Sequence, residues 1–141
     1  MPYVIQEGIL NINYSIDQTI NILTFNRSNA APIQFIITRD PGESGESLVD
    51  SVNRQIKTLK RQVKDFSEIN RQETTVGTSQ WAAINIETRF KQAGQSIYQS
   101  QIITQLPNTT LLIFTLSCIT PLDDTIRKGW IDTVKNFIPT T

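Results

Sequence analysis

The side chains that most often carry enzyme chemistry are sparse in this sequence. Among its 141 residues there is no histidine, so a Ser-His-Asp or Cys-His nucleophile and a His-ligated zinc site are excluded. The one cysteine, Cys118, lies in an apolar segment and is expected to be a small buried side chain. The carboxylate pairs Glu43/Glu46 and Asp123/Asp124 stand at expected helix starts, where capping accounts for them. We therefore expect no catalytic residue, no metal and no cofactor, with an enzyme acting through carboxylates kept as an alternative.

Charge and composition narrow the classes of partner. Thirteen Lys and Arg residues balance thirteen Asp and Glu residues, whereas a nucleic-acid surface needs an excess of basic side chains. Charged residues make up only 18% of the chain, and much of the polar content is Gln, Asn, Ser and Thr. A lone cysteine fits a reducing compartment, and the first residues lack the pattern of an export signal. We expect a cytoplasmic protein that does not insert into a membrane.

The hydrophobic pattern predicts one α+β domain over residues 1–141. Residues 4–12 predict a short strand or a broken pair of strands, and further strands are expected at 19–26 and 33–39. Apolar side chains at steps of three and four predict a long helix that is capped by Ser44 or Ser47 and reaches Phe66. Strands at 69–76, 81–91, 96–106 and 110–119 form a meander, which implies antiparallel pairing. A short helix capped by Asp123 or Asp124 follows.

Alternation along the strands separates two faces of the expected sheet. In residues 33–39 the odd positions are uniformly apolar and predict core, whereas the even positions mix aliphatic with amide and hydroxyl side chains. The same mixture recurs in residues 19–25 and 96–106. An ordinary solvent face would carry Lys and Glu, and two helices should cover one face of the sheet at most. The mixed face therefore needs a partner, which is a second copy of the chain, a ligand in a groove, or both.

One flank of the long helix is a candidate extension of this mixed face. Gln55, Leu59 and Val63 share one side of the helix at i, i+4 and i+8. For Leu59 and Val63 plain core packing is the alternative, whereas Gln55 is a polar residue within an apolar stripe.

The order of short motifs along almost the whole chain resembles the DcrB-related family, and within it the Eag-type chaperones of type VI secretion systems. No one motif is specific, and the resemblance rests on their order and spacing. It is carried by Glu7-Gly8, Asp17, Asn21-Ile22, Ile36-Ile37-Thr38-Arg39-Asp40, Glu46-Ser47-Leu48, Arg54-Gln55, Phe66, Gly77, Gln101, Thr115, Pro121 and Trp130. Other members of the family are exported lipoproteins, so the missing export signal favours the chaperone branch.

The resemblance implies a fold, an assembly and a function. The fold would be an antiparallel β-sheet with two helices, similar to the Mog1/PsbP-like architecture, and the protein would be a homodimer. Such chaperones bind the N-terminal transmembrane segments of PAAR- or Rhs-type effectors in the bacterial cytoplasm, before the effector is loaded on the VgrG spike. A non-catalytic dimerisation or regulatory module of the same fold, without such a client, is the alternative.

The resemblance also implies which residues line the groove, and these lie on the mixed face that strand alternation selects. Gln99 and Gln105 flank Gln101, and the sequence leaves open which amide contacts the client. It also leaves open whether Arg39-Asp40 is an ion pair or a loop anchor. The expected groove consists of Ile22, Gln34, Ile36, Thr38, Gln55, Leu59, Val63, Ile97, Gln99 and Gln101.

Overall fold

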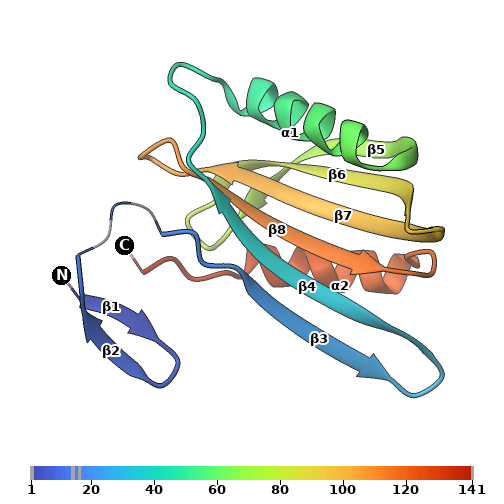
Figure 1. The fold of residues 1–141 in the computed structure, drawn as a ribbon, viewed down its shortest axis with the longest axis horizontal. Helices are drawn as coiled ribbons and strands as arrows, with labels where there is room; N and C mark the ends of the chain where they lie inside the picture. The colour runs from blue at the N-terminus through green and yellow to red at the C-terminus, as the bar shows by residue number, and fades with distance from the viewer. Residues whose placement is uncertain (1, 14, 16, 141) are drawn as a thin grey trace.

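The computed structural model describes residues 2–13, 15 and 17–140, and its body is a six-stranded antiparallel sheet (Figure 1). The strand order is β3-β4-β8-β7-β6-β5. The strands are β3 (Asn21–Arg27), β4 (Ala30–Asp40), β5 (Lys64–Val76), β6 (Trp81–Gln92), β7 (Gln95–Gln105) and β8 (Leu111–Cys118). The helices are α1 (Leu48–Gln62) and α2 (Asp124–Lys135). The predicted α+β class, with an antiparallel sheet and two helices, is confirmed.

The N-terminal segment forms a hairpin of its own. Strands β1 (Pro2–Ile5) and β2 (Gly8–Asn11) pair only with each other, as a two-stranded sheet beside the main one (Figure 1). Of the two predictions for this segment, the broken pair of strands is the one that the structure shows. Among the described residues, no helix combines the length and the hydropathy that crossing a membrane requires.

Helix α1 begins as predicted but ends earlier. Ser47 is its N-cap, and the Ser47 hydroxyl accepts a hydrogen bond of 3.1 Å from the backbone N–H of Asp50. The prediction that the helix reaches Phe66 was wrong, because Val63 is already extended and β5 starts at Lys64. From Lys64 onward the chain pairs with β6 as part of the sheet, although Phe66 still packs against the core under α1.

The two helices pack on opposite faces of the sheet, each over its own core cluster. Val52 and Ile56 of α1 contact a cluster of isoleucines and Leu111 from β6, β7 and β8. Trp130 and Val134 of α2 contact a second cluster on the other face, and Figure 1 shows α2 behind the sheet and α1 along its upper edge. The expectation that two helices cover only one face was therefore wrong. Below, the two faces are called the α1 face and the α2 face.

Because each face has only one helix, strand β3 is poorly covered on both sides. Ile22 on the α1 face is 59% exposed, and Phe25 on the α2 face is 52% exposed. In β4 the predicted core positions do point to the α2 face, where Ile33 is buried and Phe35 and Ile37 pack against the same cluster. Each face thus has a covered half around the helix and an open half around β3.

Candidate functional site

The predicted site residues lie on the α1 face, where the strand register aligns side chains from four strands. Ile22 of β3 pairs with Ile36 of β4. Ile36 pairs in turn with Thr115 of β8, which pairs with Gln101 of β7. Since residues paired across antiparallel strands point to the same face, these four side chains form one continuous row.

A second row lies next to the first on the same face. Gln34 pairs with Ser117 of β8, and Ser117 pairs with Gln99 of β7. On the other side of the first row, Thr38 pairs with the buried Ile113. Aliphatic and uncharged polar side chains therefore alternate along the strands and are mixed across them.

Helix α1 flanks these rows. At the middle of the helix the Gln55 amide nitrogen Nε2 donates a hydrogen bond of 3.0 Å to Oδ2 of Asp40, at the end of β4. Leu59 follows one turn later and is half-buried, and Val63 is the C-cap rather than a helical residue. The chain then enters β5, whose first residues pair with the end of β6. The end of β6 pairs in turn with the start of β7, where the half-buried Ile97 lies.

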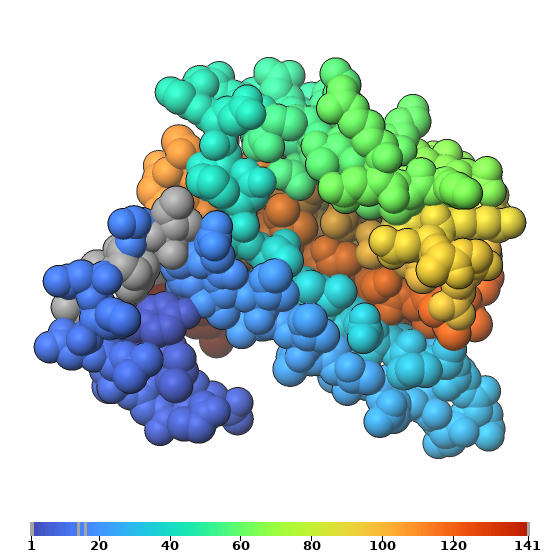
Figure 2. Space-filling view, in the orientation of Figure 1, coloured from blue at the N-terminus to red at the C-terminus, as the bar shows by residue number. Residues whose placement is uncertain are grey.

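The structure thus places the ten predicted residues on the α1 face, on the helix that flanks it or, for Val63, at the C-cap of that helix, and we call these ten side chains the candidate groove. Figure 2 shows this face hollowed between α1 and β3, with β4, β7 and β8 on the floor. Ile22 and Gln34 are exposed at the β3 side, and the other eight are half-buried.

The candidate groove combines aliphatic side chains with uncharged polar ones. None of its ten side chains is charged. Gln101 donates from Nε2 to the Thr115 hydroxyl at 3.2 Å, which orients the amide and leaves its carbonyl oxygen as an acceptor. Within the described part of the chain, the Gln99 side chain makes no hydrogen bond, whereas the Gln105 amide donates to the Glu46 carbonyl oxygen at 3.2 Å. The Gln105 side chain therefore holds the loop before α1, whereas Gln99 and Gln101 face the hollow.

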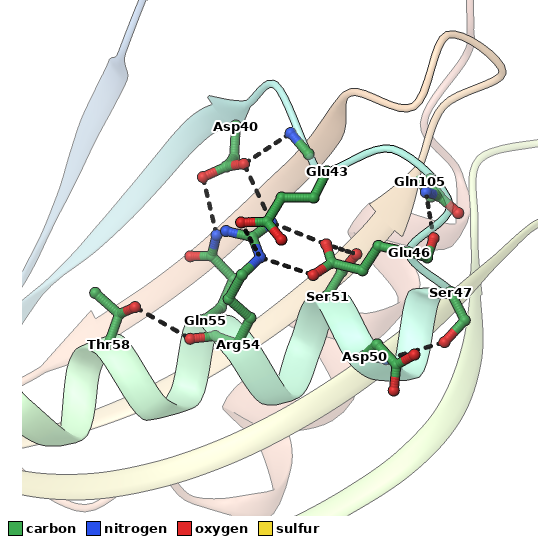
Figure 3. Close-up of polar contacts among 11 residues, drawn as sticks. Asp40, Glu43, Glu46, Ser47, Asp50, Ser51, Arg54, Gln55, Thr58 and Gln105 are labelled. Atoms are coloured by element: carbon green, nitrogen blue, oxygen red, sulfur yellow. Dashed lines mark hydrogen bonds and ion pairs between the residues drawn. The ribbon is translucent and has the colours of Figure 1, made fainter.

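An ion-pair network fixes α1 against the end of β4 (Figure 3). The Arg54 guanidinium donates to both carboxylate oxygens of Glu46, at 2.8 and 3.0 Å, and lies 3.5 Å from Oδ1 of Asp40. Glu46 also accepts a hydrogen bond of 2.6 Å from the Ser51 hydroxyl. These contacts raise the pKa of Arg54, chiefly through the hydrogen bonds to Glu46. Because Asp40 also holds Gln55, the network sets the spacing between α1 and β4 and therefore the width of the candidate groove.

This network makes stability depend on pH in a defined direction. Hydrogen bonds from Arg54, and then from Ser51, lower the pKa of Glu46 below its usual 4.5. A carboxylate with a lowered folded-state pKa stabilises the fold above its unfolded pKa, and this contribution is lost as the pH falls toward the folded value. We expect Glu46→Gln to be less stable than the wild type at neutral pH, with the difference shrinking below about pH 4.5. Urea unfolding across pH 3–7 measures this, and a difference that stays constant into acid contradicts it.

Arg39 and Asp40 are loop anchors rather than an ion pair. Their side chains point to opposite faces, as neighbours on a strand must. Nη1 of Arg39 donates to the Thr19 carbonyl at 3.0 Å and to the Asn21 side chain at 3.1 Å. Asp40 accepts from Arg54 and Gln55 on α1. The pair therefore ties the end of β4 to the start of β3 on one side and to the helix on the other.

Sequence reasoning missed Thr115 and Ser117 as members of this surface. Thr115 is 5% exposed and holds Gln101, and Ser117 lies between Gln34 and Gln99 in the second row. The signal was present, because the odd positions of β8 change from aliphatic to hydroxyl residues halfway along the strand. The role of Asp40 in holding Gln55 carried no such signal, because the two residues meet only in the folded chain.

Among the described residues, no three His, Cys, Asp or Glu side chains come together in a way that could hold a metal ion.

Comparison with known proteins gives a family match over most of the chain. The model of the family described as DcrB matches residues 7–136. No curated protein matches the sequence significantly.

Among solved structures, the chain is similar to PA94 from Pseudomonas aeruginosa, a protein described as of unknown function and as a candidate regulator. The TM-score is 0.83, with 24% sequence identity over 100% of this chain and 97% of PA94. At this level of identity the similarity shows that the two proteins share a fold.

Proposed function

The chain belongs to the DcrB family, and from this premise we propose that it is a non-enzymatic cytoplasmic chaperone for type VI secretion effectors. In this role it binds the N-terminal transmembrane segments of a PAAR- or Rhs-type effector and shields them from water until the effector is loaded on the VgrG spike. The client segments lie in the candidate groove.

The observation that carries the proposal is the row of Ile22, Ile36, Thr115 and Gln101 on an open face of the sheet. A transmembrane helix has about 20 apolar residues, and covering its surface is worth about 25 cal/mol per Å². The isoleucines supply apolar contact of this kind. Transmembrane helices also carry small and hydroxyl-bearing residues that form hydrogen bonds with neighbouring helices. The amide and hydroxyl groups of the row match these residues.

The lack of charge in the candidate groove supports the same function. An ionised side chain loses its hydration when an apolar helix covers it, which costs far more than the desolvation of an amide or hydroxyl group that finds a partner. An ordinary surface strand would carry Lys or Glu at such positions. A face that alternates between water and an apolar client is better served by Gln, Thr and Ser.

Co-expression with an effector tests the proposal. The partner is a PAAR-containing protein with N-terminal hydrophobic helices, encoded beside the gene, and the matched control is the same effector without those helices. We expect the full-length effector to be soluble and to co-purify with the chain, and the truncated effector to be soluble alone and not to bind. Equal binding of both effectors, or of neither, contradicts the proposal.

A dimerisation or regulatory module without a membrane-segment client is the second candidate. It is favoured by the apolar residues of β3 on the α2 face, such as Leu23, which is 51% exposed. The description of PA94 as a candidate regulator points the same way. A protein of this second kind would lack a neighbouring gene for a PAAR protein with hydrophobic helices.

A further inference from the structure

A polar cavity of about 300 Å³ lies on the α2 face, at the end of the sheet away from β3, between α2 and strands β5, β6 and β7. In one row of its floor Gln72 pairs with Asn85. In the next row Glu87 pairs with Asn70 on one side and with Ser100 on the other. Asn85, Glu87 and Ser100 are only 5%, 8% and 3% exposed. Because a buried polar group is costly unless it is hydrogen-bonded, the partners of these side chains determine what the cavity can hold.

The hydrogen bonds at the floor of this cavity leave one acceptor and one donor unused. Nδ2 of Asn85 donates to Oγ of Ser100 at 3.0 Å and to the backbone carbonyl of Gln101 at 3.4 Å. Since a carbonyl only accepts, the nitrogen of the Asn85 amide must lie on this side and its oxygen Oδ1 on the other. Nε1 of Trp130 donates to the same Ser100 oxygen at 3.1 Å. Ser100 therefore accepts two hydrogen bonds, and neither of them uses the proton of its own hydroxyl.

Both unused groups open to the cavity. Within the part of the chain that the structure describes, Oδ1 of Asn85 accepts no hydrogen bond and the Ser100 hydroxyl donates none. The one fully enclosed side-chain oxygen or nitrogen without a partner in that part is Oγ1 of Thr88, which pairs with Gln99 on the α1 face. Oδ1 of Asn85 is therefore reached from the cavity that Asn85 and Ser100 line. A ligand that donates to Asn85 and accepts from Ser100 satisfies both groups.

The charges at the cavity narrow the class of ligand further. Nε and Nη2 of Arg127 donate to the two carboxylate oxygens of Glu87 at 2.6 and 3.0 Å, and Nη1 donates to Asp124 at 2.9 Å. Among the described residues that line the cavity, these two carboxylates and one guanidinium are the charged groups, so one negative charge is in excess. An anion is therefore repelled. A guanidinium or ammonium group carries no acceptor, so it would leave the hydroxyl of Ser100 without a partner.

We propose that this cavity binds a carboxamide group, whose N–H donates to Oδ1 of Asn85 and whose carbonyl oxygen accepts from the hydroxyl of Ser100. A carboxamide is neutral and carries a donor and an acceptor side by side, which is the pattern that the floor of the cavity leaves open. It therefore satisfies both buried groups without adding a charge to the site.

The rest of the cavity suits a small ligand of this class. Ligand pockets have volumes of about 300–1,000 Å³, so this one has room for a small amide or for one Asn or Gln side chain of another polypeptide. Ile69 and Ile131 supply apolar contact, and the exposed amides of Asn70 and Gln72 stand on β5 at its margin. The candidate groove lies on the opposite face, so the proposal goes beyond the proposed function and does not depend on it.

The indole N–H resonance of Trp130 in ¹⁵N-labelled protein reports binding, because a ligand that accepts from the Ser100 hydroxyl polarises the oxygen to which Trp130 donates. Trp81 is the other tryptophan of the chain and contacts Phe137 instead, so its resonance is the internal control. Titration with propionamide is expected to shift the Trp130 signal saturably, with a dissociation constant in roughly the millimolar range for so small a ligand. Propionate, which is charged and lacks the donor, should bind about 10-fold more weakly or worse. The absence of a saturable shift with propionamide, or an equal affinity for propionate or glycerol, overturns the proposal.

A matched pair of variants places the ligand in the cavity. Gln72 is exposed and pairs with Asn85, so Gln72→Phe narrows the cavity without removing any of the buried hydrogen bonds. It should raise the dissociation constant of propionamide about 10-fold or more. Glu73→Phe makes the same addition at the next residue, which points to the other face, and should leave binding unchanged. Thermal midpoints verify that both variants are folded, and wild-type affinity in Gln72→Phe contradicts the proposed site.

Two further ligands distinguish the sources of the carboxamide. Free glutamine represents a small molecule, and the tripeptide Ala-Gln-Ala represents a side chain of another polypeptide, with Ala-Glu-Ala as its control. A saturable shift of the Trp130 signal is expected from the ligand of the correct source, and the tighter of the two identifies it. If Ala-Glu-Ala binds as tightly as Ala-Gln-Ala, the cavity does not select a carboxamide and the proposal is wrong.

Discussion

Under the proposed function, replacing Ile22 with aspartate is expected to abolish capture of the effector while leaving the protein folded. Ile22 is 59% exposed on edge strand β3, so the free protein keeps the new charge in water. Covering that charge with an apolar helix costs several kcal/mol, and a loss of about 100-fold or more in affinity, which is roughly 2.8 kcal/mol, is expected. The client should then aggregate or be degraded when the two proteins are co-expressed.

Two controls keep this result specific to the candidate groove. Ile22→Leu keeps an apolar side chain at the same place and should retain the client. Ile69→Asp adds the same charge at a residue of edge strand β5 that is 51% exposed and lies outside the candidate groove, and it should also retain the client. The measurement is the amount of full-length effector that co-purifies, together with the thermal midpoint of each chaperone variant. If Ile22→Asp retains the client, or Ile69→Asp loses it equally, the placement of the groove is wrong.

Strand alternation predicted which residues share a face because it is a local property. Successive side chains of a strand point to opposite sides whatever the strand packs against. The even positions of β4 and the odd positions of β7 therefore fall on one face in the structure, as Gln34, Ile36, Gln99 and Gln101 show. Capping of α1 by Ser47 and of α2 by Asp123 was predictable for the same reason.

The side on which each helix packs was not predictable from local pattern. The apolar stripe of α1 and that of α2 both require a sheet face, but neither stripe specifies which one. The choice is made by the chain path, which brings α1 over β6 and β7 on one face and α2 over the opposite face. We expected the mixed face to need a partner because the two helices would cover at most one face of the sheet. That reason is wrong, because each face carries one helix. Both faces are half open near β3, so the chain has two exposed apolar regions rather than one.

The role of Gln55 was only partly visible in the sequence. Its place within an apolar stripe indicated a special position, and it is one of the half-buried side chains of the candidate groove. Its amide, however, also donates to Asp40, which Arg54 holds in turn. That arrangement joins residues from β4 and α1, and only the folded chain brings them together. Gln55 thus holds α1 to the end of β4 through its amide nitrogen.

Replacing Trp130 with alanine is expected to cause the largest loss of stability among the substitutions considered. Trp130 is 5% exposed on the α2 face, and its ring meets Phe35 edge-on with a centroid distance of 4.9 Å. Its indole Nε1–H donates to the Ser100 hydroxyl at 3.1 Å, in a buried site that Asn85 shares. Removing a buried tryptophan costs about 3–5 kcal/mol, which for a domain of this size lowers Tm by roughly 10–15 °C.

The Trp130 variants also test whether the two faces act independently. Trp130→Phe keeps the ring contact but removes the indole donor, so that Ser100 retains only the hydrogen bond from Asn85, and an intermediate loss of about 1–2 kcal/mol is expected. Thermal unfolding followed by circular dichroism measures both variants, and an unchanged midpoint for Trp130→Ala contradicts the core assignment. Below its midpoint, Trp130→Ala should still bind the client, because the candidate groove lies across the sheet from Trp130 and shares no side chain with the α2 cluster. Trp130→Ala and Ile22→Asp are therefore expected to be opposites, the first losing stability with binding retained and the second losing binding with stability retained.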